Sequence, residues 1–138
     1  MNITVIDGQG GQLGAQLVKE IIAKFDGIDL TAIGTNALAT SAMLKAGAKN
    51  AATGENPAIV AARKSDVIIG PIGIVIADAL LGEITPKMAA AIGASNAKRI
   101  LIPTNKCDNI VVGVAFSGVS DLIADAVAKL GEIIEKMS

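Results

Sequence analysis

The stretch Asn2–Gly14, NITVIDGQGGQLG, decides the fold of this chain. Its opening residues, Asn2–Ile6, are mostly apolar and β-branched, which favours a β-strand. A glycine-rich turn, Asp7–Gly14, follows at once and overlaps the start of an apolar series with helical spacing: Leu13, Leu17, Ile21 and Phe25. A strand, a glycine turn and a helix in this order are typical of the start of an α/β nucleotide-binding domain.

Composition fits a single domain, residues 1–138, with an aliphatic core, since 51% of the residues are hydrophobic and only 1% are aromatic. The net charge is −1 and no block of like charge occurs, so we expect neither a nucleic acid nor an anionic membrane as partner. Charged residues interrupt the long apolar runs before they reach the length of a membrane span. The single Cys107 excludes an internal disulfide, and a strand at the very start leaves no room for a signal peptide, so we expect a cytoplasmic protein.

Histidine and tyrosine, two residue types common in active sites, are absent from the chain. A histidine base, a Ser-His-Asp triad, histidine metal ligands and a tyrosine–lysine proton relay are therefore excluded. We predict no metal site and assign no catalytic residue, since only carboxylates, lysines, hydroxyls and Cys107 remain as candidates.

Apolar runs and helical periodicities alternate along the rest of the chain. Further strands are predicted at Leu30–Thr35, Lys49–Ala52, Asp66–Gly70, Arg99–Pro103 and Ile110–Val114. Helices are predicted after Asn36 and Asn56 as N-caps, at Ile74–Leu81, from Thr85 to Ile92, and from Ile123 to Met137. The sequence thus predicts a single Rossmann-like three-layer α/β domain with a mostly parallel sheet of about six strands.

The last two predicted strands are too close in sequence for a parallel crossover, which needs about a dozen residues or more. If they are neighbours, the edge strand Ile110–Val114 is antiparallel.

Ligands of such sheets bind beyond the carboxyl ends of the strands, where this chain is polar and glycine-rich. The predicted binding residues are Asp7, Gly8, Gln9, Gly10, Gly11, Gln12, Gly14, Thr35, Asn36, Thr53, Gly54, Glu55, Asn56 and Gly70. We expect a nucleotide, a dinucleotide or another phosphorylated metabolite, because glycines let the backbone approach a phosphate at a helix N-terminus. The alternative is a tight turn that only packs the first helix on the sheet.

Each polar candidate also has a structural interpretation. Asp7 could accept a bond from a ribose or bind a metal through water, or it could accept N–H groups of its own turn. Glu55 could act as a base or ribose ligand, or as a loop carboxylate near a helix start. Lys106 could contact phosphate or lie in solvent, and Cys107 could be a nucleophile or an unreactive loop thiol.

The spacing Gly8-x-x-Gly11-x-x-Gly14 resembles the loop of the extended short-chain dehydrogenases/reductases over about the first 25 residues. That resemblance implies an NAD(P)-dependent enzyme, yet the Tyr-x-x-x-Lys pair of that family is absent. Thr35-Asn36 also stands where the family has the acid that binds the ribose.

Over its full length, the chain resembles more closely a family of short bacterial proteins of unknown function. The shared features are the opening Asp7–Gly11, DGQGG, and the later Thr53–Asn56, TGEN. This resemblance implies the single Rossmann-like domain and no activity.

The segment Pro71–Ile92 offers few polar side chains and is expected to expose an apolar helix face. Such a patch usually marks an interface, so we predict a homo-oligomer, most simply a dimer, formed through Pro71–Ile92. The alternative is that the final helix or a loop of the same chain covers the patch. Three functions remain open: a small-molecule binding protein, an enzyme (a reductase or transferase) using the same pocket, or an interaction subunit without a ligand.

Overall fold

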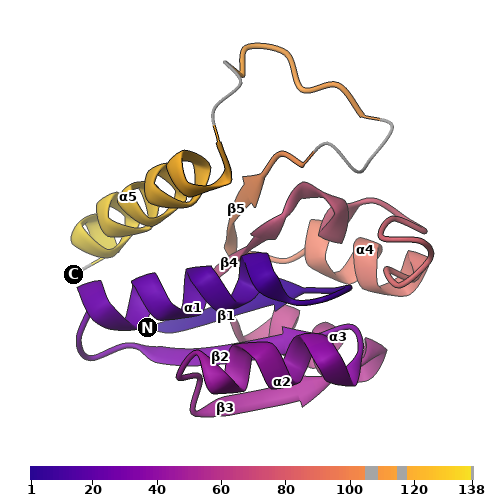
Figure 1. Ribbon diagram of the computed structural model, residues 1–138, viewed down its shortest axis with the longest axis horizontal. Coiled ribbons are helices and arrows are strands. Elements are labelled where there is room, and N and C mark those ends of the chain that lie inside the picture. The colour runs from indigo at the N-terminus through magenta and orange to yellow at the C-terminus, as the bar shows by residue number, and fades with distance from the viewer. Residues whose placement is uncertain (105–108, 115–117, 138) are drawn as a thin grey trace.

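The computed structural model describes residues 1–104, 109–114 and 118–137 (Figure 1). The strands are β1 (Asn2–Asp7), β2 (Asp29–Gly34), β3 (Asn50–Thr53), β4 (Val67–Pro71) and β5 (Lys98–Ile102). The helices are α1 (Gln12–Lys24), α2 (Ala37–Lys45), α3 (Glu55–Lys64), the 3-10 helix η1 (Ile72–Val75), α4 (Pro86–Gly93) and α5 (Val119–Met137). None of the helices in these described stretches is long and apolar enough to span a membrane.

The strands form one sheet in the order β3-β2-β1-β4-β5, and every neighbouring pair is parallel. From the central β1 the chain builds outward through β2 and β3, and then returns to the other side of β1 for β4 and β5. The strand order therefore reverses between β1 and β4, which is where ligands of open α/β sheets bind. This confirms the predicted Rossmann-like class.

Helices cover both faces of the sheet and give three layers (Figure 1). Successive side chains of β1 pack on opposite faces of the sheet, because side chains along a strand point alternately to its two sides. Ile3 and Val5 pack in a core cluster with residues of α1, α2 and α5, whereas Ile6 packs in a second cluster with residues of α3 and α4. All three side chains are fully buried, which explains the mostly apolar sequence of this strand.

The predicted strand Ile110–Val114 is wrong, since the described part of the chain pairs five strands and none lies there. Ile110 and Val112 are 95% and 89% exposed, and Gly113 has a left-handed φ of 82°. The segment lies beyond the carboxyl end of β5 and away from the sheet (Figure 1). Its β-branched composition fits a strand, but no neighbour supplies the pairing, and the antiparallel edge is not found.

The predicted helix Ile74–Leu81 is also wrong. Only the short η1 forms, and a series of turns follows it as far as Ile84. Asp78, Leu80 and Leu81 have left-handed φ values of 66°, 57° and 58°, which an α-helix cannot contain.

Of the two predicted N-caps, Asn36 is correct and Asn56 is not, and the helix predicted to start at Thr85 has that residue as its N-cap. The side chains of Asn36 and Thr85 accept the N–H groups of Ala39 and Met88, as N-caps do. The third helix instead begins at Glu55 after Gly54, so Asn56 lies inside the first turn and is not its cap.

The structure does not support the exposed apolar helix face expected in Pro71–Ile92. Ile74, Ile84 and Ile92 are fully buried in the core of this chain. Within Pro71–Ile92, the one large apolar side chain that is exposed is that of Leu81, at 96%. The exposed apolar patch from which we predicted an interface through Pro71–Ile92 is therefore not present, and homo-oligomerisation stays a prediction.

Candidate functional site

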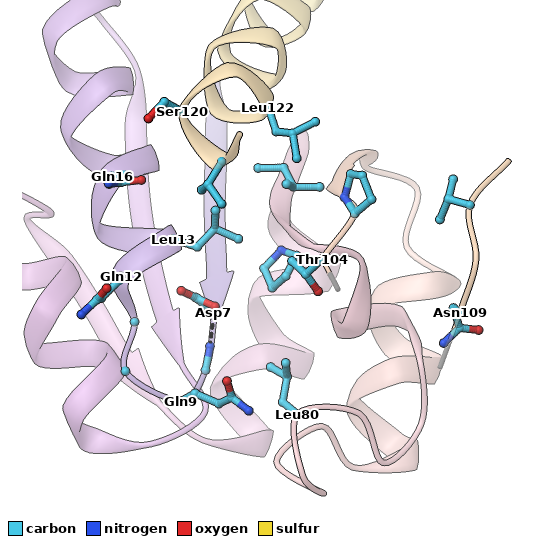
Figure 2. Close-up of a pocket in the computed structure, with 18 of the residues that line it drawn as sticks. Asp7, Gln9, Gln12, Leu13, Gln16, Leu80, Thr104, Asn109, Ser120 and Leu122 are labelled. Atoms are coloured by element: carbon cyan, nitrogen blue, oxygen red, sulfur yellow. Dashed lines mark hydrogen bonds between the residues drawn. The ribbon is translucent and has the colours of Figure 1, made fainter. Parts of the chain in front are cut away.

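A pocket of about 970 Å³ lies at the carboxyl ends of β1, β4 and β5, where the strand order reverses (Figure 2). Its walls come from the glycine loop, the start of α1, the ends of β4 and β5, Leu80, the segment 109–114 and the start of α5. The lining residues are Asp7, Gly8, Gln9, Gly10, Gly11, Gln12, Leu13, Gln16, Pro71, Leu80, Ile102, Pro103, Thr104, Asn109, Ile110, Val111, Val114, Val119, Ser120 and Leu122.

Gly10 and Gly11 have different roles in the loop. A Cβ at Gly11 would lie 2.6 Å from the Cα of Ala39, and its φ is 73°, so this glycine lets α1 and α2 pack closely. Gly10 is exposed, and a Cβ there would have no described atom within 4 Å. Gly10 is thus the loop position with room for a ligand.

Asp7 ends β1 and is 6% exposed. Its carboxylate oxygens accept the N–H groups of Gly8 at 2.8 Å and of Gly14 at 2.7 Å. A Cβ at Gly14 would lie 2.8 Å from the Cβ of Asp7, so the glycine is needed for this contact. Asp7 therefore holds the loop on the first turn of α1, as its structural interpretation predicted, while it also lines the pocket.

Glu83 is a residue of the site that the sequence did not reveal. One carboxylate oxygen accepts the backbone N–H of Gln9 at 2.9 Å, the amide of Asn36 at 2.9 Å and the hydroxyl of Thr35. Burial raises the pKa of Glu83, but the bonds from Thr35, Gln9 and Asn36 together lower that pKa below its ordinary value of 4.5. Its one signal in the sequence was that it is an acidic residue, as Asp78 is, in a mostly apolar segment, which does not identify its partners.

Thr35 and Asn36 therefore lie beside the glycine loop but outside the pocket lining. Besides its bond to Glu83, the Asn36 amide donates to the carbonyl oxygen of Gln9 at 3.0 Å, and its oxygen caps α2 at 2.9 Å. These two residues at the end of β2 support the loop from one side.

The predicted binding residues at the end of β3, Thr53–Asn56, do not line the pocket. Thr53 shares a hydrogen bond of 2.7 Å with Thr40, and the N–H of Gly54 donates to the carbonyl oxygen of Gly34. Glu55 accepts a bond of 3.1 Å from Thr85, which joins α3 to α4. Asn56 is exposed.

Gly70 also has a packing role. A Cβ at this position in β4 would overlap the carbonyl oxygen of Ile6 in β1. Of the predicted binding residues, Asp7–Gln12 line the pocket, whereas Gly14, Thr35, Asn36, Thr53–Asn56 and Gly70 do not. Lys106 and Cys107 lie outside the described residues.

The pocket combines an apolar wall with uncharged polar groups and the carboxylate of Asp7. Leu13 and Thr104 lie near the middle of the view in Figure 2, Leu80 lies below them, and Ser120 comes from α5. The described lining residues include no lysine or arginine, so the donors they offer to an anion are backbone N–H groups and uncharged side chains. No group of three acidic or thiol side chains that could hold a metal occurs within 1–104, 109–114 and 118–137.

The chain belongs to the family described as domain of unknown function DUF3842, whose model matches residues 2–135. No curated protein matches it. Among solved structures, it is similar to the FMN-dependent cysteine decarboxylase TvaF from thioviridamide biosynthesis, with a TM-score of 0.50 and 13% identity over 95% of this chain and 86% of that one. It is also similar to a dodecameric FMN-dependent UbiX-like decarboxylase from Escherichia coli O157:H7, with a TM-score of 0.47 and 16% identity over 95% and 77% of the two chains. At this identity, the similarity to TvaF shows the fold.

Proposed function

We propose that this member of the DUF3842 family binds a phosphorylated ligand of mononucleotide size in the pocket beside the glycine loop. One observation carries the proposal: a pocket of about 970 Å³ lies at the point where the strand order reverses. Its volume is near the upper end of the range of about 300–1,000 Å³ that is usual for small-molecule sites.

The phosphate end of the ligand is assigned to the start of α1. The first N–H groups of a helix have no carbonyl partner within it, and the helix dipole favours an anion there. The N–H of Gly14 already bonds to Asp7, whereas those of Gln12 and Leu13 have no partner among the described residues, and Gly10 lies open beside them.

The ring end of the ligand is assigned to the apolar wall. The apolar side chains that line the pocket include Leu13, Leu80, Pro71 and Ile102, and an apolar wall with a few polar groups is usual for cofactor sites. FMN is the first ligand to test, because it joins a phosphate to a flat ring system and because TvaF is FMN-dependent.

A fluorescence titration of FMN with the purified protein tests the proposal. The chain has no Trp or Tyr, so the emission followed is that of the flavin. We expect saturable binding that Gly10→Val weakens by about tenfold or more, equal to about 1.4 kcal/mol. Gly93→Val, at the end of α4, is the matched control, since a Cβ there also meets no described atom.

Absence of saturable binding by FMN, AMP and ribose 5-phosphate would overturn the proposal and favour an interaction subunit without a ligand. If folded Gly10→Val binds FMN with the affinity of the wild type, the glycine loop is not part of the binding site. Turnover of a substrate by the loaded protein would identify the enzyme alternative, a reductase or transferase using this pocket.

A further inference from the structure

The segment Ile76–Ile84 lies across the ends of β1 and β2. Besides the three hydrogen bonds of Glu83, it packs on the glycine loop itself. A Cβ at Gly8 would lie 2.8 Å from a Glu83 carboxylate oxygen and 2.9 Å from a Leu80 methyl carbon. The β2 side of the loop is therefore filled by side chains of the same chain.

This segment is held firmly in that place. Ile84 is fully buried, and backbone bonds join Asp78 N–H to the Ile84 carbonyl at 2.7 Å and Ile84 N–H to the Ala79 carbonyl at 3.1 Å. The left-handed conformations of Asp78, Leu80 and Leu81 are unfavourable for residues other than glycine and persist only where surrounding contacts fix them.

The filled space is the one that the second half of a dinucleotide takes in Rossmann domains. There an acid at the end of β2 binds the ribose of that half while the pyrophosphate lies at the glycine loop. Here Thr35 and Asn36 stand at the end of β2, and both already donate to Glu83. A diphosphate passing this point would also meet a carboxylate of like charge.

We infer that Glu83 is a specificity-determining residue, which limits the pocket to mononucleotide ligands by occupying the β2 side of the glycine loop. The inference rests on the proposed function and adds the ligand class. FMN and FAD are the matched probes, since FAD is FMN extended by AMP.

The experiment measures the affinities of both flavins for the wild type, Glu83→Ala and Glu83→Gln. We expect the wild type to prefer FMN and Glu83→Ala to shift the FAD/FMN affinity ratio toward FAD by about tenfold or more. Glu83→Gln keeps the side-chain volume but lacks the charge, so a shift of about threefold in the same direction is expected. Glu55→Gln is the control, because Glu55 bonds to Thr85 and not to the loop.

An unchanged ratio in folded Glu83→Ala overturns the inference, and if that variant does not fold, an unchanged ratio in Glu83→Gln does so. Equal affinity of the wild type for both flavins also overturns it and leaves the proposed function standing. Binding of neither flavin by the wild type overturns the FMN proposal, and the inference falls with it.

Discussion

Removing the carboxylate of Glu83 should destabilise the fold as well as open the site. Glu83→Ala deletes the acceptor of three hydrogen bonds, from Thr35, Asn36 and the backbone of Gln9. A buried bond to a charged group contributes about 1.5–3 kcal/mol, but Glu83 is half-buried, so about 1 kcal/mol each is appropriate. Because the three bonds share one oxygen, we expect a total loss of about 2–3 kcal/mol.

Thermal unfolding followed by far-UV circular dichroism measures this loss. For a chain of this size, 1 kcal/mol corresponds to about 4 °C, so Tm at pH 7 should fall by about 8–12 °C. The variant should remain folded at 25 °C, since domains have about 5–15 kcal/mol of stability. A fall of less than about 2 °C would refute the assigned role of these bonds.

The pH dependence separates the charge from the packing of the side chain. The pKa of Glu83 in the folded protein lies below the ordinary value of 4.5 expected in the unfolded chain. Its charge-dependent stabilisation is therefore complete above about pH 4.5 and is lost as the pH falls through the folded pKa. The stability difference between wild type and Glu83→Gln should be constant from about pH 7 to 5.5 and should shrink below about pH 4.5. A difference that stays the same at acid pH would contradict this interpretation.

Three further predictions concern the sheet, the chemistry and the assembly. Gly70→Ala should destabilise the protein by about 3 kcal/mol, because its Cβ overlaps the Ile6 carbonyl, whereas Gly93→Ala should change stability by less than about 1 kcal/mol in denaturant titrations. Neither NAD nor NADP should support hydride transfer above background with a panel of carbonyl substrates, because tyrosine and histidine are absent and Thr35-Asn36 replaces the ribose-binding acid; a clear rate would disprove this. Light scattering after size exclusion should show a homo-oligomer. If Pro71–Ile92 forms the interface of the oligomer, the exposed Leu81 should contribute to it, and Leu81→Glu should increase the fraction of monomer. A monomeric wild type would contradict the predicted homo-oligomer.

The predictable part of this protein was encoded over short distances in the sequence. The opening strand, the glycine turn, the cap at Asn36, the helix start at Thr85 and the alternation of elements all depend on residues within a few positions of one another. These signals were sufficient for the fold class and for the first six pocket residues, Asp7–Gln12.

The unpredicted part depends on contacts between distant residues. Glu83 bonds to Thr35 across 48 positions, and no local pattern marks that pair. Ile74–Leu81 has the composition of a buried helix, but tertiary packing fixes it as turns with left-handed residues. Ile110–Val114 has strand-forming residues without a paired neighbour. The start of α5 lines the pocket because of the path of the chain through the fold, and the hydrophobic periodicity of the sequence does not specify that path.

The central position of β1 has a consequence for synthesis on the ribosome. Within the described sheet, β1 is made before the other strands. One of its edges can pair with β2 soon afterwards, whereas the other edge stays unpaired until β4 is made, whose residues Val67–Ile69 pair with Ile3–Val5. The unit from β1 to β3 can therefore form early, with an apolar strand edge still open to other nascent chains. The pocket closes last, because its wall at Val119–Leu122 is made after every strand of the described sheet. A chain arrested before α5 would thus carry the glycine loop without a complete pocket.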